Sequence, residues 1–421
     1  MRKVISVLLL VCIMLSVSAC GGQTTVVRPG ETHELKSDDL RADNRAELVA
    51  VTDVALPELK KIVSRFNAQS EDYYVRLIEY SGTDKSMELL RTEILAGKAP
   101  DIYAFYSYSS LSEVEPKNNF EDLLPYLDAD SEYGRETLVP GLFNALSEGG
   151  QLYWLPYDYS IETFVAHESM VGSKAKLTME DLDAIAAAQR PALHVFPEWM
   201  AQDLLLYYVS TFSIDRFVDS QAGTCDFDNP DFLRLLKKCS LQPEKSVPDD
   251  HDTGVLTSYS LQCLEQIAIL STNYGADFRF VGFPDEESNG SMFSVNLRLG
   301  VSTQSKNKDG AWAFVRSILN TENQVEATFL PATQAEFDAR LTQAINGDYN
   351  APHFGPVKIE QADIDKLAAL IDETRVLSGH NAVLRQIIQE ECLAYFAGDK
   401  SVEETARVIQ SRASLYISEH S

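Results

Sequence analysis

The fold is decided by the stretch AELVAVTDVALPELKKIVSRFNAQSEDYYVRLIEYSGTDKSMELLRTEILAGKAPDIYAF (Ala46–Phe105). Three short apolar runs in it predict buried strands, and two longer segments with one apolar face predict helices at 56–67 and 85–96. The predicted strands are Ala46–Val51, Tyr73–Ile78 and Asp101–Phe105. Strands that alternate with helices at this spacing form right-handed crossovers, so the stretch predicts an α/β fold with a parallel sheet.

The carboxyl ends of these predicted strands carry acidic and aromatic side chains. Ligands of open parallel sheets bind beyond such ends. The sequence places Asp53 after the first strand, Asp84 after the second, and Tyr106 and Tyr108 after the third. We expect these four residues to contact a ligand, although Asp53 and Asp84 fit helix caps equally well.

The N-terminus has the features of an export signal. An apolar run over 4–17 follows two basic residues and is shorter than the roughly 20 residues that a membrane-spanning helix needs. The run ends in VSAC (Val17–Cys20), which resembles the bacterial lipobox. The resemblance implies a signal peptide over 1–19, cleavage before Cys20, and acyl chains such as palmitate on Cys20. An ordinary signal peptide with a chance cysteine is the alternative, and the polar stretch up to residue 44 predicts a flexible tether.

Composition excludes several functional classes. The chain has 421 residues, with 63 acidic and 36 basic side chains and a net charge of −27. This balance argues against binding to nucleic acid and against electrostatic adhesion to anionic lipid. The length suits two domains, and no second long apolar segment follows the signal. The histidines and cysteines match no metal-ligand spacing; Cys225 and Cys239 could pair after export, but buried free thiols fit equally well.

Seven segments, taken in chain order, resemble one protein family. They are RTEILAGKAPDIYAF (91–105), GGQLYWLPYDYSIETFVAH (149–167), LTMEDLDAIAA (177–187) with an approximate capping box at Thr178, VGFP (281–284), KNKDGAWAFVRSILNTENQ (306–324), FLPATQAEF (329–337) and GDKSVEETARVIQSRASLYISE (398–419). Together they resemble bacterial extracellular solute-binding lipoproteins of the maltose-binding type, the sugar-binding family 1 of ABC transporters. The stretch from Pro197 to Asp277 carries no such signature.

The resemblance implies an α/β, two-lobed periplasmic-binding-protein-like fold of type II, with hinge segments that cross between the lobes. The first lobe is expected over 45–156 plus 285–332, and the second over 157–284 plus 333–421. It further implies a monomer on the extracytoplasmic face of the cell membrane. Such a protein captures a carbohydrate between its lobes and delivers it to the permease of an ABC importer, with no cofactor and no metal.

Sugars present hydroxyl groups and flat C–H faces, so their sites combine aromatic rings with polar side chains. On this ground we expect further ligand contacts at the first crossing, in the middle region and at the return crossing. Trp154 fits a core position equally well. The further candidates are Trp154, Tyr157, Asp158, Tyr159, Trp199 and Arg298.

Other functions have less support in the sequence. The sequence has no GxSxG, HExxH or GxGxxG pattern, and no motif points to the carboxylate pair of a glycosidase. An enzyme, such as a secreted hydrolase, is therefore not expected. The remaining alternatives keep the fold: another solute such as a polyamine or a peptide, or presentation of the ligand to a sensor kinase.

Overall fold

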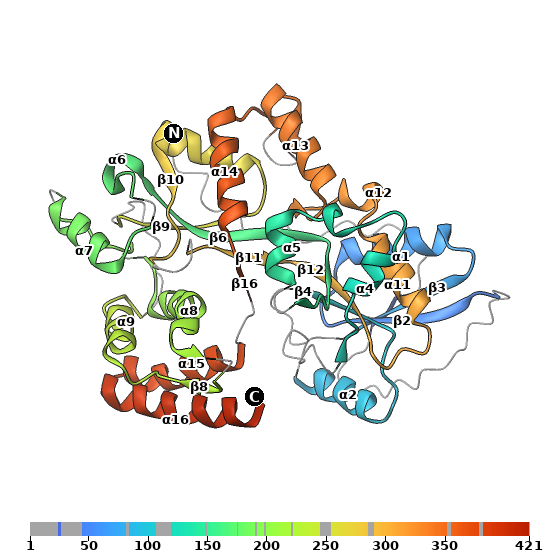
Figure 1. Cartoon of the computed structure of the whole chain (residues 1–421), viewed down its shortest axis with the longest axis horizontal. Coiled ribbons are helices and arrows are strands. Elements are labelled where there is room, and N and C mark those ends of the chain that lie inside the picture. Colours follow the sequence, from blue (N-terminus) through green and yellow to red (C-terminus); the bar gives the residue numbers. More distant parts are fainter. Residues whose placement is uncertain are drawn as a thin grey trace.

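Two sheets, each covered by helices, divide the molecule into two lobes (Figure 1). The structure is a computed structural model. It describes residues 24–26, 44–80, 84–106, 119–147, 150–174, 176–189, 192–197, 199–219, 222–244, 254–284, 290–351, 355–378 and 382–420. The predicted lipidation site Cys20 lies outside these residues, and so does Tyr108.

The first sheet has the strand order β1-β3-β2-β4-β12-β5. Strands β1, β3, β2 and β4 are parallel, whereas β12 runs antiparallel to both β4 and β5. Its strands are β1 (Thr24–Val26), β2 (Ala46–Thr52), β3 (Tyr73–Glu79), β4 (Ile102–Tyr106), β5 (Leu155–Pro156) and β12 (Leu297–Val301). The parallel sheet predicted from the sequence is confirmed. Thr24–Val26 lies beside β3 although it falls in the stretch predicted to be a tether, and its three residues all have side chains that favour strands.

The helices of this lobe begin and end where local sequence signals place them. Helix α1 (Pro57–Gln69) has proline in its first turn and buries Leu59, Ile62 and Val63. Helix α2 (Asp84–Leu95) ends before Gly97, whose φ of 74° few other residues adopt. Helix α1 packs on β3, and α11 (Lys308–Ser317) packs on β2 and β12. The other helices of this region are α4 (Leu124–Ala129), η2 (Arg135–Thr137) and α5 (Pro140–Leu146).

The second sheet is built around β6 (Asp158–His167), the longest strand of the two sheets. Its main order is β10-β6-β11-β16, and β9 and β13 also pair with β6. All partners of β6 are antiparallel, whereas β11 and β16 are parallel. The partner strands are β9 (Thr257–Leu261), β10 (Phe278–Phe280), β11 (Met292–Val295), β13 (Leu330–Pro331) and β16 (Val376–Leu377).

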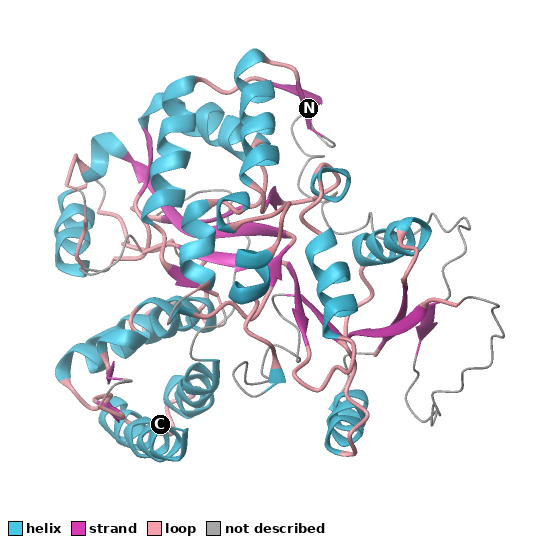
Figure 2. Cartoon of the chain, turned by 45° about the vertical axis from the view of Figure 1, so that its right-hand side comes forward, coloured by secondary structure: helices cyan, strands magenta, loops and turns pink. Residues whose placement is uncertain are grey.

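Helices surround the second sheet, and four of them pack together at one end of the lobe (Figures 1 and 2). These four are α8 (Gln202–Phe212), α9 (Pro230–Ser240), α15 (Ala382–Phe396) and α16 (Val402–His420). In α7 (Met179–Ala188), Thr178 and Asp181 form the predicted capping box. The remaining elements are α6 (Glu168–Val171), η4 (Ile214–Arg216), β7 (Val218–Asp219), β8 (Thr224–Cys225), α10 (Glu265–Tyr274), η5 (Gly275–Asp277), α12 (Thr321–Gln324), α13 (Gln334–Asn346), β14 (Tyr349–Ala351), β15 (Gly355–Val357) and α14 (Gln361–Glu373).

Two apolar cores stabilise the molecule. The larger runs from Leu48 in the first sheet to Ile161 and Phe278 in the second, so it is continuous across the boundary between the sheets. The smaller joins Phe164 to the four packed helices. The cysteines at 225, 239, 263 and 392 are free thiols, and burial raises the pKa of Cys392 to about 12. Cys392 is therefore a buried free thiol of low reactivity.

Candidate functional site

The chain passes between the two sheets at three places. Strand β5 belongs to the first sheet and β6 to the second, so the first passage is at Tyr157. The second passage is at Asn296, between β11 and β12. The third lies between α12 and β13, which pairs with β6 at Asp158 and Tyr159. We call this region the lobe junction. The expected lobe boundaries remain a proposal, and the strand pairing favours Asn296 over residue 285 for the return passage.

The side chain of Asp158 contacts the other two passages. Its carboxylate accepts hydrogen bonds from the backbone N–H of Leu297 and of Phe329, both at 3.3 Å. Burial raises the pKa of Asp158 to about 7, and the Glu58 carboxylate adds to the shift, while the two N–H donors and Arg340 oppose it. Protonation of this carboxyl group near neutral pH therefore changes the polar contacts at the point where all three passages meet.

Tyr157 joins the first passage to the third. Its side chain is 2% exposed, and its hydroxyl donates a hydrogen bond to the backbone oxygen of Asn323 at 2.8 Å. The Gln324 amide donates to the backbone oxygen of Tyr157 at 2.9 Å, and its oxygen accepts from Thr333 N–H at 3.1 Å. A buried amide with partners on both atoms fixes these segments in one arrangement.

Arg340, on the buried face of α13, holds the third passage. Its guanidinium donates to the backbone oxygens of Gln324, Ala327 and Phe329 at 3.0–3.1 Å. It also pairs with Glu336 at 3.0 Å. The backbone oxygens that follow the short helix α12 thus receive hydrogen bonds from one buried cation.

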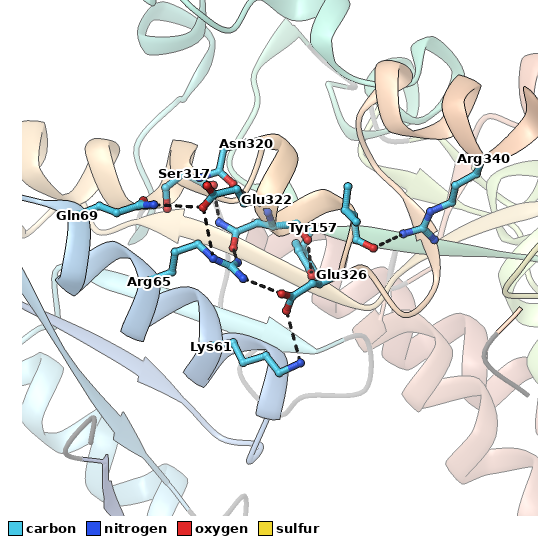
Figure 3. A network of polar contacts seen from close by, with 11 residues as sticks. Lys61, Arg65, Gln69, Tyr157, Ser317, Asn320, Glu322, Glu326 and Arg340 are labelled. Atoms are coloured by element: carbon cyan, nitrogen blue, oxygen red, sulfur yellow. Dashed lines mark hydrogen bonds and ion pairs between the residues drawn. The ribbon is translucent and has the colours of Figure 1, made fainter. Parts of the chain in front are cut away.

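An ion-pair network connects α1 to α12 beside the junction (Figure 3). Arg65 pairs with Glu326 at 2.7 Å and with Glu322 at 3.6 Å. Lys61 pairs with Glu326 at 3.4 Å, and Gln69 donates to Glu322 at 3.1 Å. Lys61, Glu322 and Glu326 are well exposed to water and only Arg65 is mostly buried, at 22% exposed, so each pair adds little stability on its own.

Aromatic rings and one arginine lie on the other side of the junction. Trp154 is 7% exposed and contacts Phe105 and Phe120 edge to face, with ring centroids 5.2 and 4.4 Å away. The guanidinium of Arg298 lies 5.2 Å from the Trp154 ring centroid. Tyr106, at the end of β4, is half-buried, and burial and the Asp158 charge raise its pKa. The structure therefore brings Tyr106, Trp154 and Arg298 to the junction with Tyr157 and Asp158.

The other predicted contact residues are placed differently. Asp53 is buried directly after β2, and Asp84 is the first residue of α2. Tyr159 is fully buried, and its ring contacts Phe293 at 5.6 Å. Trp199 is half-buried and packs against the smaller core, not the one that contains Trp154.

The sequence did not predict the roles of Asn323, Gln324 and Arg340. One signal was available for Arg340, because it lies in the apolar stripe of α13 between Phe337 and Ala344, where a charge needs a partner. The roles of Asn323 and Gln324 depend on Tyr157, which is more than 160 residues away. Nothing in the local sequence encodes that contact.

Two further observations bear on function. Within the described part of the chain, no three His, Cys, Asp or Glu side chains gather in a way that would hold a metal ion. No helix in the same part is long and apolar enough to cross a membrane.

Comparisons with known proteins agree with this architecture. A family model described as bacterial extracellular solute-binding protein matches residues 61–333. The fold is similar to the sugar-binding protein MalE from Xanthomonas citri, with TM-score 0.60 and 12% identity over 89% of this chain and 98% of that one. It is also similar to the cyclic alpha-maltosyl-1,6-maltose binding protein from Arthrobacter globiformis, with TM-score 0.56 and 12% identity over 89% and 100%.

A third similar structure is an ABC substrate-binding protein from Listeria monocytogenes in complex with cycloalternan. Its TM-score is 0.50, with 15% identity over 89% of this chain and 99% of that one. At these identities the likeness concerns the fold. A comparison with curated protein sequences found no match.

Proposed function

The chain belongs to the bacterial extracellular solute-binding proteins, which bind rather than convert their ligands, and on this premise we propose that it captures a carbohydrate between its two lobes and delivers it to an ABC importer. The observation that carries the proposal is the lobe junction, where three passages meet at Asp158. Lobes joined by a few such passages can open and close as hinged bodies.

In the proposed cycle, the solute shifts the population toward the closed form. A ligand that contacts both lobes only when they are closed binds that form more tightly, and the difference in affinity sets the extent of closure. The membrane permease then engages the closed form. No bond is made or broken in this cycle.

The proposed ligand contacts fall into two groups. Tyr106, Trp154 and Arg298 offer aromatic surface and hydrogen-bond donors at the carboxyl end of β4, as a sugar site requires. The second group lies in the same lobe: Asp53 follows β2, and Asp84 is the first residue of α2. Tyr108 and Trp199 are proposed as ligand contacts from the sequence alone. Tyr157 and Asp158 bond within the protein, so we propose that they position the hinge and contact the solute only when the lobes close.

We also propose that the mature protein is a monomer held at the extracytoplasmic face of the membrane by lipid on Cys20. The support is the VSAC segment that ends the apolar run. Cys20→Ser should release the protein from the membrane fraction and abolish incorporation of labelled palmitate. Retention of both in the variant would exclude this anchor.

A thermal-shift screen of the full chain tests the cargo class. The panel holds neutral and acidic mono- and oligosaccharides, polyamines and short peptides. A ligand at about 1,000 times its dissociation constant stabilises the native state by roughly 4 kcal/mol, which is a clear upward shift in Tm. We expect a saccharide to give this shift.

Variants then place the site. Tyr106→Ala should lose the shift, while Tyr126→Ala, a half-buried aromatic on α4, should keep it. Hits confined to polyamines or peptides would overturn the carbohydrate assignment while leaving the solute-binding role intact. If the response of cells to the ligand requires a sensor kinase and no permease, the protein presents its ligand to that kinase and not to an importer.

A further inference from the structure

Two buried hydrogen-bond donors at the second passage have no acceptor in the part of the chain that the structure describes. Arg298 is 6% exposed and Asn296 is 5% exposed. The Nε atom of Arg298 and the Nδ2 atom of Asn296 are buried and make no hydrogen bond. Leaving a buried donor unpaired is unfavourable, and more so for a charged group. Two such donors within three residues are unusual, because more than nine in ten buried polar groups have partners.

Among the described residues, the surroundings of Arg298 supply no negative charge. Its guanidinium carbon lies 5.2 Å from the centroid of the Trp154 ring and 6.0 Å from that of Phe105. In the described part of the chain no carboxylate pairs with it, and burial alone lowers its pKa to about 10. The residue is therefore still charged at neutral pH. Ring faces attract a cation, but they accept no hydrogen bonds in the plane of the guanidinium.

The position of Arg298 is that of a ligand contact. It pairs in register with Phe105 of β4 and Pro156 of β5, one residue before the chain leaves the first sheet at Tyr157. This is the carboxyl end of the parallel strands, where ligands of such sheets bind. A guanidinium fork recognises carboxylate or phosphate oxygens with two parallel hydrogen bonds.

We infer that Arg298, with Asn296 beside it, binds an anionic substituent of the cargo, so that the solute is an acidic saccharide. The inference rests on the proposed carbohydrate function and names its chemical class. The net charge of −27 makes a local cation necessary, because the overall field repels an anion until it reaches the site. A carboxylate and a phosphate share this chemistry, and the test separates them.

The experiment measures binding of matched sugar pairs to the full chain by isothermal titration calorimetry. The pairs are galacturonate with galactose, glucuronate with glucose, the dimers of each, and the 6-phosphates of both hexoses. We expect an acidic member to bind about tenfold to hundredfold more tightly than its neutral partner, because charge-assisted hydrogen bonds are stronger than neutral ones. A preference for uronates identifies a carboxylate, and a preference for the 6-phosphates identifies a phosphate.

The methyl ester of the preferred uronate provides a test that needs no variant. It keeps the sugar ring and removes the charge, so it should bind as weakly as the neutral sugar. Arg298→Met should remove the preference for the acid, and Arg298→Lys should restore part of it. Arg316→Met on α11 is the matched control and should keep the preference, because Arg316 already pairs with Asp130 at 2.7 Å.

The outcomes separate the two proposals. Equal binding of acid, ester and neutral sugar would overturn the inference and leave the carbohydrate function standing. Binding of a polyamine or a peptide, with no sugar bound in either form, would overturn the carbohydrate function and this inference together. Acid preference that survives Arg298→Met would show that another group binds the anion, which also overturns the assignment.

Discussion

Arg340 and Arg298 are two buried arginines on either side of the lobe junction, and they differ in their hydrogen-bond partners. They are 8% and 6% exposed. Arg340 donates to three backbone oxygens of the third passage and pairs with Glu336, whereas among the described residues the guanidinium of Arg298 contacts only aromatic rings. A guanidinium supplied with acceptors holds structure together, and one without them favours a partner from outside. The comparison separates the part of the junction that stabilises the fold from the part that we propose binds the solute.

Replacing each arginine by methionine gives the largest expected difference in stability between the two sites. Arg340→Met leaves Glu336 and several backbone oxygens without their partner, so the free energy of unfolding should fall by about 3–5 kcal/mol. Arg298→Met removes an unpaired buried charge, so unfolding in urea should show no loss of stability or a gain. Equal destabilisation by the two variants would mean that Arg298 is also a structural residue.

A second test uses pH, because Asp158 lies between the two regions. Its pKa is raised to about 7 from an unfolded value near 4, so the folded state binds more protons in that window. The contribution of Asp158 to stability is therefore greatest at low pH and falls as pH rises from about 4 to about 7, by a few kcal/mol at roughly 1.4 kcal/mol per pKa unit. Asp158→Asn should flatten this part of the profile measured by urea unfolding.

Asp130 is the control of opposite sign. Burial opposes ionisation of its carboxyl group, but hydrogen bonds from the N–H groups of Glu132 and Tyr133 and the charge of Arg316 lower its pKa. Its contribution is present at neutral pH and is lost as pH falls through the folded-state pKa. A variant Asp130→Asn that flattened the profile between pH 4 and 7 would contradict both assignments.

Two neighbouring tyrosines differ in the same way, because the hydroxyl of one has a hydrogen-bond partner and that of the other has none among the described residues. Tyr157→Phe removes a buried hydrogen bond to Asn323 and should cost about 1–2 kcal/mol of unfolding free energy. Tyr159→Phe removes a buried hydroxyl that makes no hydrogen bond, so the variant should be at least as stable as the parent. Both variants delete one oxygen atom, and the difference between them in thermal unfolding is the result to measure. A larger loss from Tyr159→Phe would reverse the interpretation.

The smallest effect is expected at the surface. Lys61 is 64% exposed and pairs with Glu326 at 3.4 Å. Lys61→Gln should change the unfolding free energy by at most about 0.5 kcal/mol, because exposed ion pairs are screened by water and salt. The difference in unfolding free energy between variant and parent should be smaller at high salt than at low salt. A loss comparable to that of Tyr157→Phe would show that the ion pairs between α1 and α12 contribute to the junction after all.

The sequence predicted the strands and helices between residues 46 and 106 because their signals are local. Strands β2, β3 and β4 and helices α1 and α2 lie within two residues of their predicted bounds, and the capping box at Thr178 is present. Each is encoded by apolar periodicity, a proline or a glycine over fewer than fifteen residues. The family resemblance was confirmed by the family model over residues 61–333, and one of its seven segments, at 91–105, lies in these elements.

The junction was predicted only in part, because its contacts are between distant segments. The sequence identified Tyr157 and Asp158 as residues of a crossing but did not predict that Asn323, Leu297 and Phe329 bond to them. Strand β13 has two residues, too few for a periodic signal, and its pairing with β6 depends on the fold. Trp199 packs in the smaller core, in the stretch where no family motif was found.

The central claim is that the two lobes close on a solute at the junction. Small-angle X-ray scattering of the full chain, with and without a saturating amount of the best saccharide from the screen, tests it most directly. We predict that the radius of gyration decreases on binding, and that the Arg298→Met chain at the same solute concentration keeps its open dimensions. Tight binding with an unchanged radius of gyration would contradict hinged closure.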